Sequence, residues 1–483
     1  MKKLLSIFLA VGLVLSSFSF VAIAQTALPD FEVAWEEWDS YFNELDNTLI
    51  SLTLGADETQ VNFNWHSDLA LGKPAVRIST SADMSDYTEF EGLFTFAETM
   101  EQRVNRVTVT GLEENTYYYY SYEDGSGFSE PAPFRTLSSD SFKVIYVSDN
   151  QNNHHDGDEV AARLMSYNWQ SNLSNALSAN KDISFILSAG DQTQNGDNSE
   201  EWIHALAPKA LRSVPFATTV GNHDNKGTTY RHYVNNPNTY YGNTPSLTGN
   251  NYWFRHGDVL FMIFNSTNPN LHDHFNFTKN AVMENNDAKW RVGMLHHDIY
   301  GTGHHAAEND NHLLKSMIAP IADMFEFDIV LTGHEHIYGR SFYMYENKIV
   351  DVEGYDNGNV CDPQGTIYFT ASGASNNNRV PDEPYSYDWL AFSVIDKISL
   401  YSTIEFDSNS LTLETFFTDN NAKADEFNIT KTDTTFSDIS DVTFGEYFDN
   451  ALEILTGDYY IIVNVVMTVL KTVYSLFGSL VLS

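Results

Sequence analysis

Between residues 49 and 136 the chain consists of short runs in which apolar and polar residues alternate. These runs are LISLTLG, VNFNWHS, PAVRIST, RVNRVTVTGL, TYYYYSYE and PAPFRTL, with Gly, Asp, Ser and Pro between them. A period of two places every second side chain on the same face of a strand, so each run predicts a strand with one buried face. Short strands at this spacing predict an antiparallel β-sandwich.

A different pattern begins near Ser141. The apolar runs are FKVIYVSD (142–149), DISFILSAGD (182–191), VPFATTVGNHD (214–224), DVLFMIFNST (258–267), WRVGMLHH (290–297) and FDIVLTGHEH (327–336). Mostly apolar runs are typical of strands covered on both faces. Stretches with helical periodicity separate several of them, so the sequence predicts a layered α/β domain. Strands return between 366 and 431, where we expect them to complete the sheet.

The first 24 residues have the pattern of a secretory signal peptide. Lys2 and Lys3 precede an apolar stretch, and Ala22-Ile23-Ala24 fits a cleavage site, so the mature chain is expected to begin near Gln25. An uncleaved membrane anchor is the alternative. The chain has one cysteine, Cys361, so it forms no intramolecular disulfide. Export without disulfides favours a bacterial protein that is secreted or displayed at the cell surface.

The C-terminal segment has a third pattern. FGEYFDNALEIL predicts a helix that Thr456 and Gly457 would end. Residues 459–483 then form an apolar run with one narrow polar stripe, and Lys471 lies near its middle. The run is long enough to span a bilayer, but a lysine at that depth is costly. A membrane or helix partner and packing on the protein's own surface both stay open.

These patterns divide the chain into segments. They are a signal peptide (1–24), an acidic lead (25–48), a fibronectin type III-like sandwich (49–137), the layered domain (138–431) and an apolar helical tail (432–483). The 65 Asp and Glu against 26 Lys and Arg give a formal net charge of −39. Such a charge repels nucleic acid, so we expect no nucleic-acid partner.

Several strands of the layered domain stop at side chains that can bind metals. Ligands bind at the carboxyl ends of strands in such sheets, so we expect these side chains to meet at one edge. Oxygen and nitrogen ligands together favour Fe, Mn or Zn over calcium. A metal pair with Asp191 as the bridge would activate water and hold a phosphoryl group. The candidate ligands are Asp149, Asp191, Asn222, His296, His334 and His336.

The motifs SAGD (188–191), GNHD (221–224), the histidine after WRVGML and GHEH (333–336) resemble those of calcineurin-like metallophosphoesterases. The preceding sandwich points to the purple acid phosphatase branch. The resemblance covers about residues 49–431 and implies an α+β layered β-sandwich flanked by helices. It also implies one metal held by Asp149, Asp191 and His336, and a second held by Asp191, Asn222, His296 and His334.

The resemblance also implies residues on the substrate side. His223 matches a histidine near the substrate phosphate, and Asp224 is a candidate carboxylate to orient it. His304 and His305 follow at a distance that fits the other substrate histidines, and His305 fits better. His305 or His223 would protonate the leaving group.

Two positions depart from the family pattern. Purple enzymes carry a tyrosine three residues after the bridging aspartate, where this chain has Gln194, so the tyrosinate-to-iron colour should be missing. The wider superfamily uses a histidine two residues after its first aspartate, where this chain has Gln151. The first metal therefore lacks a usual ligand of either kind. Arg340, just after GHEHIYG, could meet substrate or pair with a carboxylate.

The sequence thus predicts a secreted phosphatase with two divalent or trivalent metals, Fe with Zn or Mn. It would hydrolyse small phosphate monoesters through attack of a metal-bound hydroxide. A phosphodiesterase or nucleotidase that uses the same metals is one alternative. The other is a non-catalytic cell-surface binding protein, which the glutamines at 151 and 194 suggest.

Overall fold

The computed structural model describes residues 31–458, except 47, 70–71, 98–100, 153–158, 308 and 433–434. The signal-peptide segment and the apolar tail from 459 onward therefore lie outside the described residues. The chain forms two compact units, Met1–Glu44 and Leu45–Ser483. In the first unit, helix α2 (Phe31–Phe42) brings the Trp38 ring against the rings of Tyr41 and Phe42.

The second unit begins with the predicted antiparallel β-sandwich. Its strands are β1 (Ser51–Leu54), β2 (Val61–Ser67), β3 (Ala75–Ser79), β4 (Thr88–Glu91), β5 (Leu93–Ala97), β6 (Gln102–Val109), β7 (Tyr117–Tyr122) and β8 (Ala132–Arg135). They form two sheets in the orders β1-β2-β6-β5 and β4-β3-β7-β8. Phe63, Trp65, Val76, Tyr120 and Phe134 are buried between the sheets. Alternation therefore predicted this domain correctly.

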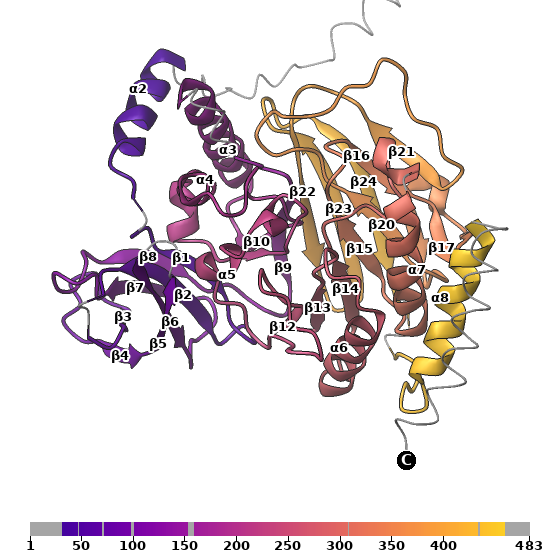
Figure 1. Cartoon of the computed structure of the whole chain (residues 1–483), viewed down its shortest axis with the longest axis horizontal. Helices are drawn as coiled ribbons and strands as arrows, with labels where there is room; N and C mark the ends of the chain where they lie inside the picture. The colour runs from indigo at the N-terminus through magenta and orange to yellow at the C-terminus, as the bar shows by residue number, and fades with distance from the viewer. Residues whose placement is uncertain are drawn as a thin grey trace, which may run out of the picture. The chain divides into compact units, whose positions relative to one another are not determined.

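The layered domain contains two seven-stranded mixed sheets (Figure 1). In order, the first comprises β11 (Phe216–Thr218), β10 (Ile183–Ser188), β9 (Phe142–Val147), β22 (Leu400–Phe406), β23 (Ser410–Phe417), β24 (Lys423–Thr430) and β19 (Asn359–Cys361). The second comprises β12 (Tyr252–His256), β13 (Val259–Ile263), β14 (Trp290–Met294), β15 (Ile329–Thr332), β20 (Ile367–Thr370), β16 (Tyr338–Ser341) and β21 (Leu390–Val394). A hairpin of β17 (Tyr343–Tyr345) and β18 (Lys348–Val350) stands apart.

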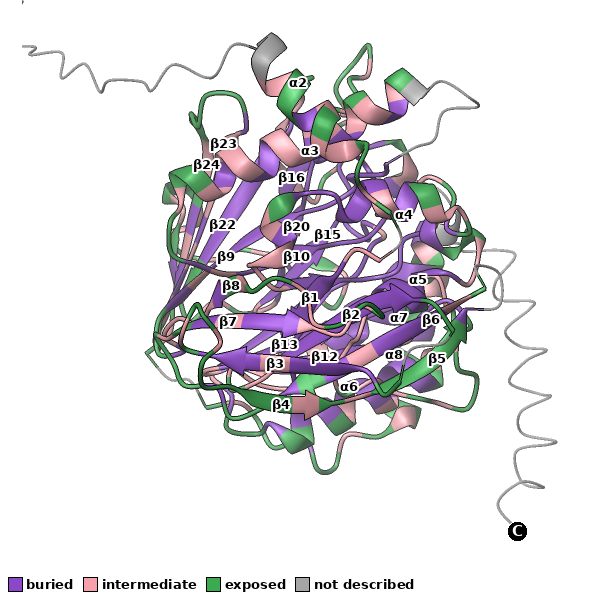
Figure 2. Cartoon of the chain, turned by 90° about the vertical axis from the view of Figure 1, so that its left-hand side faces the viewer, coloured by how far each residue is buried: buried purple, intermediate pink, exposed green. Residues whose placement is uncertain are grey.

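Side chains of the two sheets interdigitate in one core. Phe142, Leu187, Phe261, Met294 and Leu413 belong to this cluster and are almost fully buried. The strands of this core are buried along most of their length, whereas β4 and β5 at the edge of the first domain are exposed (Figure 2). The apolar runs are therefore apolar because both faces of their strands are covered.

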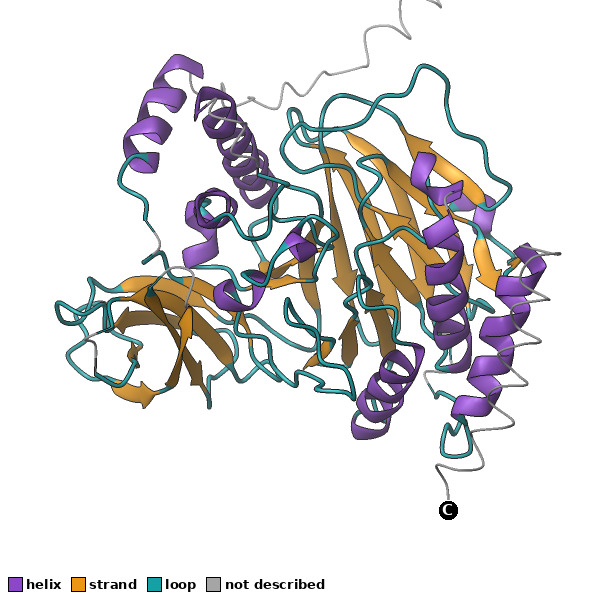
Figure 3. Ribbon diagram, in the orientation of Figure 1, coloured by secondary structure: helices purple, strands orange, loops and turns teal. Residues whose placement is uncertain are grey.

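Helices cover the outer face of each sheet (Figure 3). Trp169 of α3 (Glu159–Ala179) and Trp202 of α4 (Ser199–Leu206) pack on Ile145 and Ile186 of the first sheet. The second sheet is covered by α6 (Leu271–Glu284), α7 (Asn309–Met324) and α8 (Phe444–Asp458). Shorter helices are α5 (Tyr230–Tyr233), η2 (Lys209–Arg212), η3 (Asp224–Lys226), η4 (His304–Ala307) and η5 (Tyr355–Asn357). The predicted α/β layering is confirmed.

Three details differ from the sequence-based expectations. The strands from 366 onward do not complete one sheet, because β20 and β21 join the second sheet while β22, β23 and β24 join the first. Helix α6, whose His274 and Phe277 are buried, was not predicted. Helix α8 does not end at Gly457 but reaches Asp458, and it buries Tyr447 and Ala451. No helix in the described part of the chain combines the length and apolar character that crossing a membrane would need.

The first domain holds the backbone of residues 231–235 in the second. Asn64 and His66 of β2 donate to the carbonyl oxygen of His232 at 3.0 and 2.9 Å. Thr53 and Asn62 donate to the carbonyl oxygen of Asn235 at 2.9 and 2.8 Å. These side chains supply partners for carbonyl groups at the end of the short helix α5 and just after it, which have no partner within a helix.

Candidate metal centre

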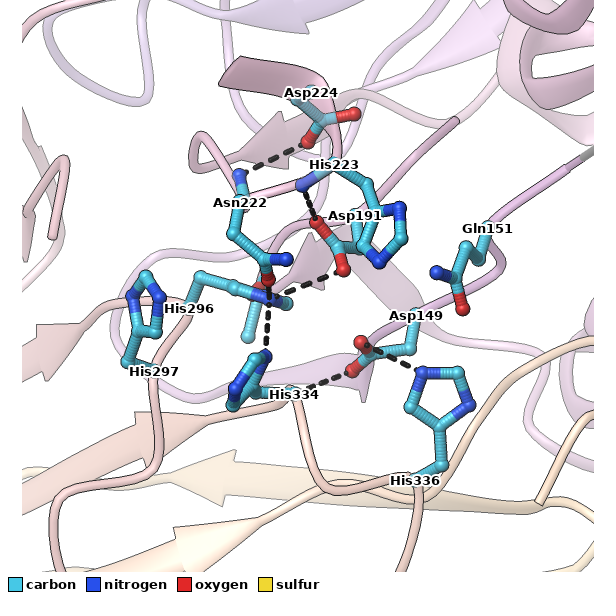
Figure 4. Close-up of polar contacts among 12 residues, drawn as sticks. Asp149, Gln151, Asp191, Asn222, His223, Asp224, His296, His297, His334 and His336 are labelled. Atoms are coloured by element: carbon cyan, nitrogen blue, oxygen red, sulfur yellow. Dashed lines mark hydrogen bonds and ion pairs between the residues drawn. The ribbon is translucent and has the colours of Figure 1, made fainter. Parts of the chain in front are cut away.

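The candidate ligands come from loops at one edge of the two sheets. Strands β9, β10 and β11 run parallel in the first sheet, and β14 and β15 run parallel in the second. The His334 backbone N–H, after β15, donates to Asp149 Oδ2, after β9, at 2.8 Å. The carboxyl ends of strands from both sheets therefore meet. The side chains that point toward a common centre in Figure 4 are Asp149, Asp191, Asn222, His296, His334 and His336.

One group of ligand atoms surrounds His296 Nε2. This nitrogen lies 3.0 Å from Asn222 Oδ1, 3.2 Å from Asp191 Oδ2 and 3.2 Å from His334 Nδ1. The ligand atoms of Asp191, His296 and His334 all lie within 4.8 Å of one another. The combination of one carboxylate, one amide oxygen and two imidazoles fits a single transition-metal ion.

A second group lies beside the first. His336 Nε2 is 3.3 Å from Asp149 Oδ1. Both atoms are buried, and neither has a hydrogen-bond partner among the residues that the structure describes. Buried polar atoms are rarely left unsatisfied in folded proteins. A cation between these two atoms would satisfy both, so the residues fit a second metal ion.

Backbone carbonyls fix the orientation of two of the imidazoles. His296 Nδ1 lies 2.8 Å from the carbonyl oxygen of Ala189, and His336 Nδ1 lies 3.0 Å from that of Asn377. Because a carbonyl only accepts, each Nδ1 carries a proton, and each Nε2 is the nitrogen turned toward the centre, where it would lose its proton to bind a metal. This second contact is the usual way in which a protein sets the tautomer of a metal-binding histidine.

The backbone at the centre adopts strained conformations. A positive φ is unusual for residues other than glycine and clusters at functional sites. Two glycines permit the close approach of the ligands. A Cβ at Gly221 would lie 2.0 Å from Asp191 Oδ1, and one at Gly190 would lie 2.7 Å from His296 Nδ1. The site residues with positive φ are Asp149 (53°), Gln151 (39°), Asp191 (51°), His334 (75°) and His336 (55°).

The charges at the centre stabilise one another. Burial alone would raise the pKa of Asp149 and of Asp191, but His336 beside the first and His296 beside the second hold both pKa values below the usual range. Burial would lower the pKa of His296, yet Asp191 and Asp149 raise it to about 9. Both carboxylates are therefore ionised at neutral pH and available to a cation.

The predicted substrate histidines lie at the rim of the centre. The backbone N–H of His223 donates to Asp191 Oδ1 at 2.8 Å, and its ring is half-buried. His304 and His305 belong to η4, and the ring of His305 lies 4.4 Å from that of His334 between centroids. The structure thus places His223 beside Asp191 and His305 beside His334, two ligands of the group around His296 Nε2.

Asp224 does not orient His223 as predicted. Its Oδ1 accepts hydrogen bonds from the backbone N–H groups of Gln192 and Thr193, and its Oδ2 accepts one from Gly221. Burial raises its pKa to about 7. Asp224 therefore ties the SAGD and GNHD loops together, because the loop geometry turns its carboxylate toward backbone donors instead of the neighbouring imidazole.

The structure also settles the environment of Arg340. Its Nε donates to Asp425 Oδ2 at 2.9 Å and its Nη2 to Asp425 Oδ1 at 3.2 Å, with both side chains largely buried. Arg340 thus pairs with a carboxylate.

Sequence reasoning missed Lys226 and Arg379, whose side chains lie against His223 and His305. Lys226 follows GNHD closely and could have been found, but Arg379 lies in an aperiodic loop without any motif.

Two mixed sheets with carboxylates, an amide and imidazoles gathered at their strand ends define a metallophosphoesterase. Residues 142–338 match the calcineurin-like phosphoesterase family, and residues 48–136 match the N-terminal domain of purple acid phosphatases. The chain therefore contains a calcineurin-like phosphoesterase domain that follows a purple acid phosphatase N-terminal domain, and these domains identify it as a phosphoesterase. The family implies divalent metal ions, which the group of Asp191, His296 and His334 fits.

Solved structures share this fold. A purple acid phosphatase, PPD1, from seeds of yellow lupin (Lupinus luteus) superposes with a TM-score of 0.63 at 16% identity, over 79% of this chain and 74% of that one. The structure of PhoD superposes with a TM-score of 0.53 at 11% identity, over 85% of this chain and 98% of that one. At these identities the similarity describes the architecture alone.

Proposed function

We propose that this chain hydrolyses phosphate monoesters at a centre of two metal ions. The observation that carries the proposal is the convergence of Asp191, Asn222 and His334 on His296 Nε2, beside the unsatisfied pair of Asp149 Oδ1 and His336 Nε2. The match of residues 48–136 to the N-terminal domain of purple acid phosphatases supports it. Fe with Zn or Mn remains the metal pair that we expect from the ligand types.

In this proposal, some of the residues would hold the metal ions and others would contact the substrate. One ion would be held by Asp191, Asn222, His296 and His334, and the other by Asp149, His336 and the shared Asp191. When bound, two such ions polarise the phosphoryl oxygens and lower the pKa of water. His223 and His305 at the rim would donate hydrogen bonds to the phosphoryl group, and one of them would protonate the departing alcohol.

The test is metal content measured together with hydrolysis. The purified protein is assayed with p-nitrophenyl phosphate before and after chelation, and again with Fe, Mn or Zn restored. Two ions per chain and turnover that disappears with the chelator and returns with metal would support the proposal. One ion or none, without turnover of any monoester, would refute it.

We also propose that the chain is exported. The pattern of residues 1–24 supports this, and the acidic composition suits an exported protein that must stay soluble. N-terminal sequencing of protein recovered from the medium or the cell envelope tests the idea. A mature terminus near Gln25 would support it, whereas an intact leader on protein in the cytosol would contradict it.

A further inference from the structure

Two cationic side chains accompany the rim histidines. Lys226 Nζ lies 2.6 Å from His223 Nδ1 and 3.0 Å from the carbonyl oxygen of Gln194. Arg379 Nη1 lies 2.7 Å from His305 Nε2. Within the described residues, neither cation lies within ion-pair distance of a carboxylate. Both side chains are exposed, so a ligand can reach them.

Free cations at this position stand out against the charge of the chain. With a formal net charge of −39, the protein as a whole repels a phosphate dianion. Elsewhere, cations such as Lys143, Arg255 and Lys431 are paired with Glu405, Asp287 and Asp328. A substrate with two negative charges therefore needs a local positive field, and the metal ligands Asp149 and Asp191 only add negative charge before metal binds.

Hydrogen bonds join each cation to its rim histidine. A guanidinium group has donors only, so His305 Nε2 accepts from Arg379. His223 Nδ1 lies 2.6 Å from Lys226 Nζ and 3.0 Å from the carbonyl oxygen of Gln194. Within the described residues the guanidinium group of Arg379 makes no other hydrogen bond, so further N–H donors are available to an anion.

The two cations flank the centre from different parts of the chain. Lys226 is the last residue of η3 and lies against His223, whose backbone N–H donates to Asp191. Arg379 lies in the loop after β20 and donates to His305, whose ring lies against that of His334. Arg379 also lines a cavity of about 130 Å³ together with His304 and Tyr385. An ester bound at the centre would thus have Lys226 near Asp191, and Arg379 near His334 beside a space large enough for a small alcohol group.

We propose that Lys226 and Arg379 form an anion clamp that selects doubly charged phosphate monoesters over singly charged diesters. This inference rests on the proposed hydrolysis at the metal centre and adds which phosphate esters that centre prefers. A diester replaces one anionic oxygen by a neutral ester oxygen, so one of the two cations loses its partner. Each cation therefore strengthens binding of the monoester more than binding of the diester.

The test compares two substrates that share a leaving group, p-nitrophenyl phosphate and methyl p-nitrophenyl phosphate. In Lys226→Met and Arg379→Met, kcat/KM for the monoester should fall by about 10–100-fold, mainly through KM, since a charge-assisted hydrogen bond is lost. The diester should change by less than about threefold. Lys226→Arg and Arg379→Lys should restore most of the monoester preference. Arg231→Met, which removes an exposed cation from the segment after η3, should change neither substrate.

The possible outcomes distinguish failure of the proposed clamp from failure of the proposed metal-dependent hydrolysis. Equal losses on both substrates, or no recovery in the charge-retaining variants, would overturn the clamp and leave metal-dependent hydrolysis standing. Absence of turnover of either ester by the metal-loaded wild type would overturn both. Metal content measured for every variant distinguishes weaker substrate binding from loss of the centre itself.

Discussion

Gln151 Nε2 donates a hydrogen bond to Gln194 Oε1 at 2.8 Å. These are the two positions at which related enzymes carry a histidine or a tyrosine as an additional ligand of the first metal. In this chain the two amides satisfy each other, and neither supplies an imidazole or a phenolate. The ion beside Asp149 and His336 would therefore have fewer protein ligands than the ion beside His296.

The two ions should consequently differ in affinity. Loss of even an outer-shell partner weakens metal binding by about 10–100-fold, so loss of a direct ligand should weaken it at least as much. During stepwise dialysis against a chelator, we expect one ion per chain to leave first and the second to remain until the chelator concentration is at least about tenfold higher. Metal analysis at each step measures this, and simultaneous loss of both ions would contradict it.

Gln194 also determines the colour of an iron-loaded protein. Without a tyrosine three residues after Asp191, no tyrosinate-to-iron absorption should be present in the visible spectrum. Gln194→Tyr, which also breaks the hydrogen bond to Gln151, should introduce such a band. Gln151→Ala is the matched control, because it breaks the same hydrogen bond without adding a phenolate. A visible band of this kind in the wild type would show that another tyrosine reaches the metal.

Asn222 should be essential although it is uncharged. Its Oδ1 points at the group around His296 Nε2, so Asn222→Ala should remove a ligand and lower kcat by about 100-fold or more, while the half-buried position tolerates alanine. Asn225→Ala is the control, since Asn225 lies in the same loop but accepts from Thr248 Oγ1 instead. Turnover and metal content measured for both variants test the assignment. Full activity in Asn222→Ala would remove Asn222 from the centre.

The side chains that the sequence singled out as ligands do come together, whereas their surroundings could not be predicted. Asp149, Asp191 and His296 each follow an apolar strand, and strand direction alone places such residues at one edge. What could not be predicted depends on loop geometry. Whether Asp224 faces His223 or the backbone of Gln192 depends on how two loops cross, and no periodicity encodes that. The division of the strands into two sheets was missed for a similar reason, because a strand buried on both faces looks the same in either sheet.

The Arg340 and Asp425 pair should contribute to stability and not to turnover. Arg340→Met would leave the carboxylate of Asp425 buried, with Tyr338 as its remaining donor, so unfolding should become easier by about 3–5 kcal/mol. Urea denaturation measures the change. Arg340→Met combined with Asp425→Leu should recover much of the loss, since no unpaired charge remains. A fall in kcat/KM of the folded single variant, without a change in stability, would instead place Arg340 at the substrate.

Asp323 of α7 provides a test of pH dependence away from the metals. Burial raises its pKa to about 7, although the backbone N–H of Glu346 donates to it. A carboxyl group whose pKa is higher in the folded than in the unfolded state stabilises the fold below about pH 4, and this contribution is lost as the pH rises through about 7. Asp323→Asn should therefore be more stable than the wild type by about 1–3 kcal/mol at pH 8 and equal to it at pH 4. Thermal unfolding at both pH values gives the comparison, and a pH-independent difference would exclude ionisation as the cause.

The hydrogen bonds from β2 to the carbonyl groups of His232 and Asn235 make the N-terminal sandwich more than an appended module. Without the sandwich, the end of α5 and the two residues after it, which follow the GNHD loop, would have to find new partners for their backbone or rearrange. An engineer who wished to transplant the second domain alone would need to bring the sandwich along or redesign residues 231–235. Substitutions in β1 or β2 can therefore disturb the candidate metal centre, although none of the candidate ligands belongs to this domain.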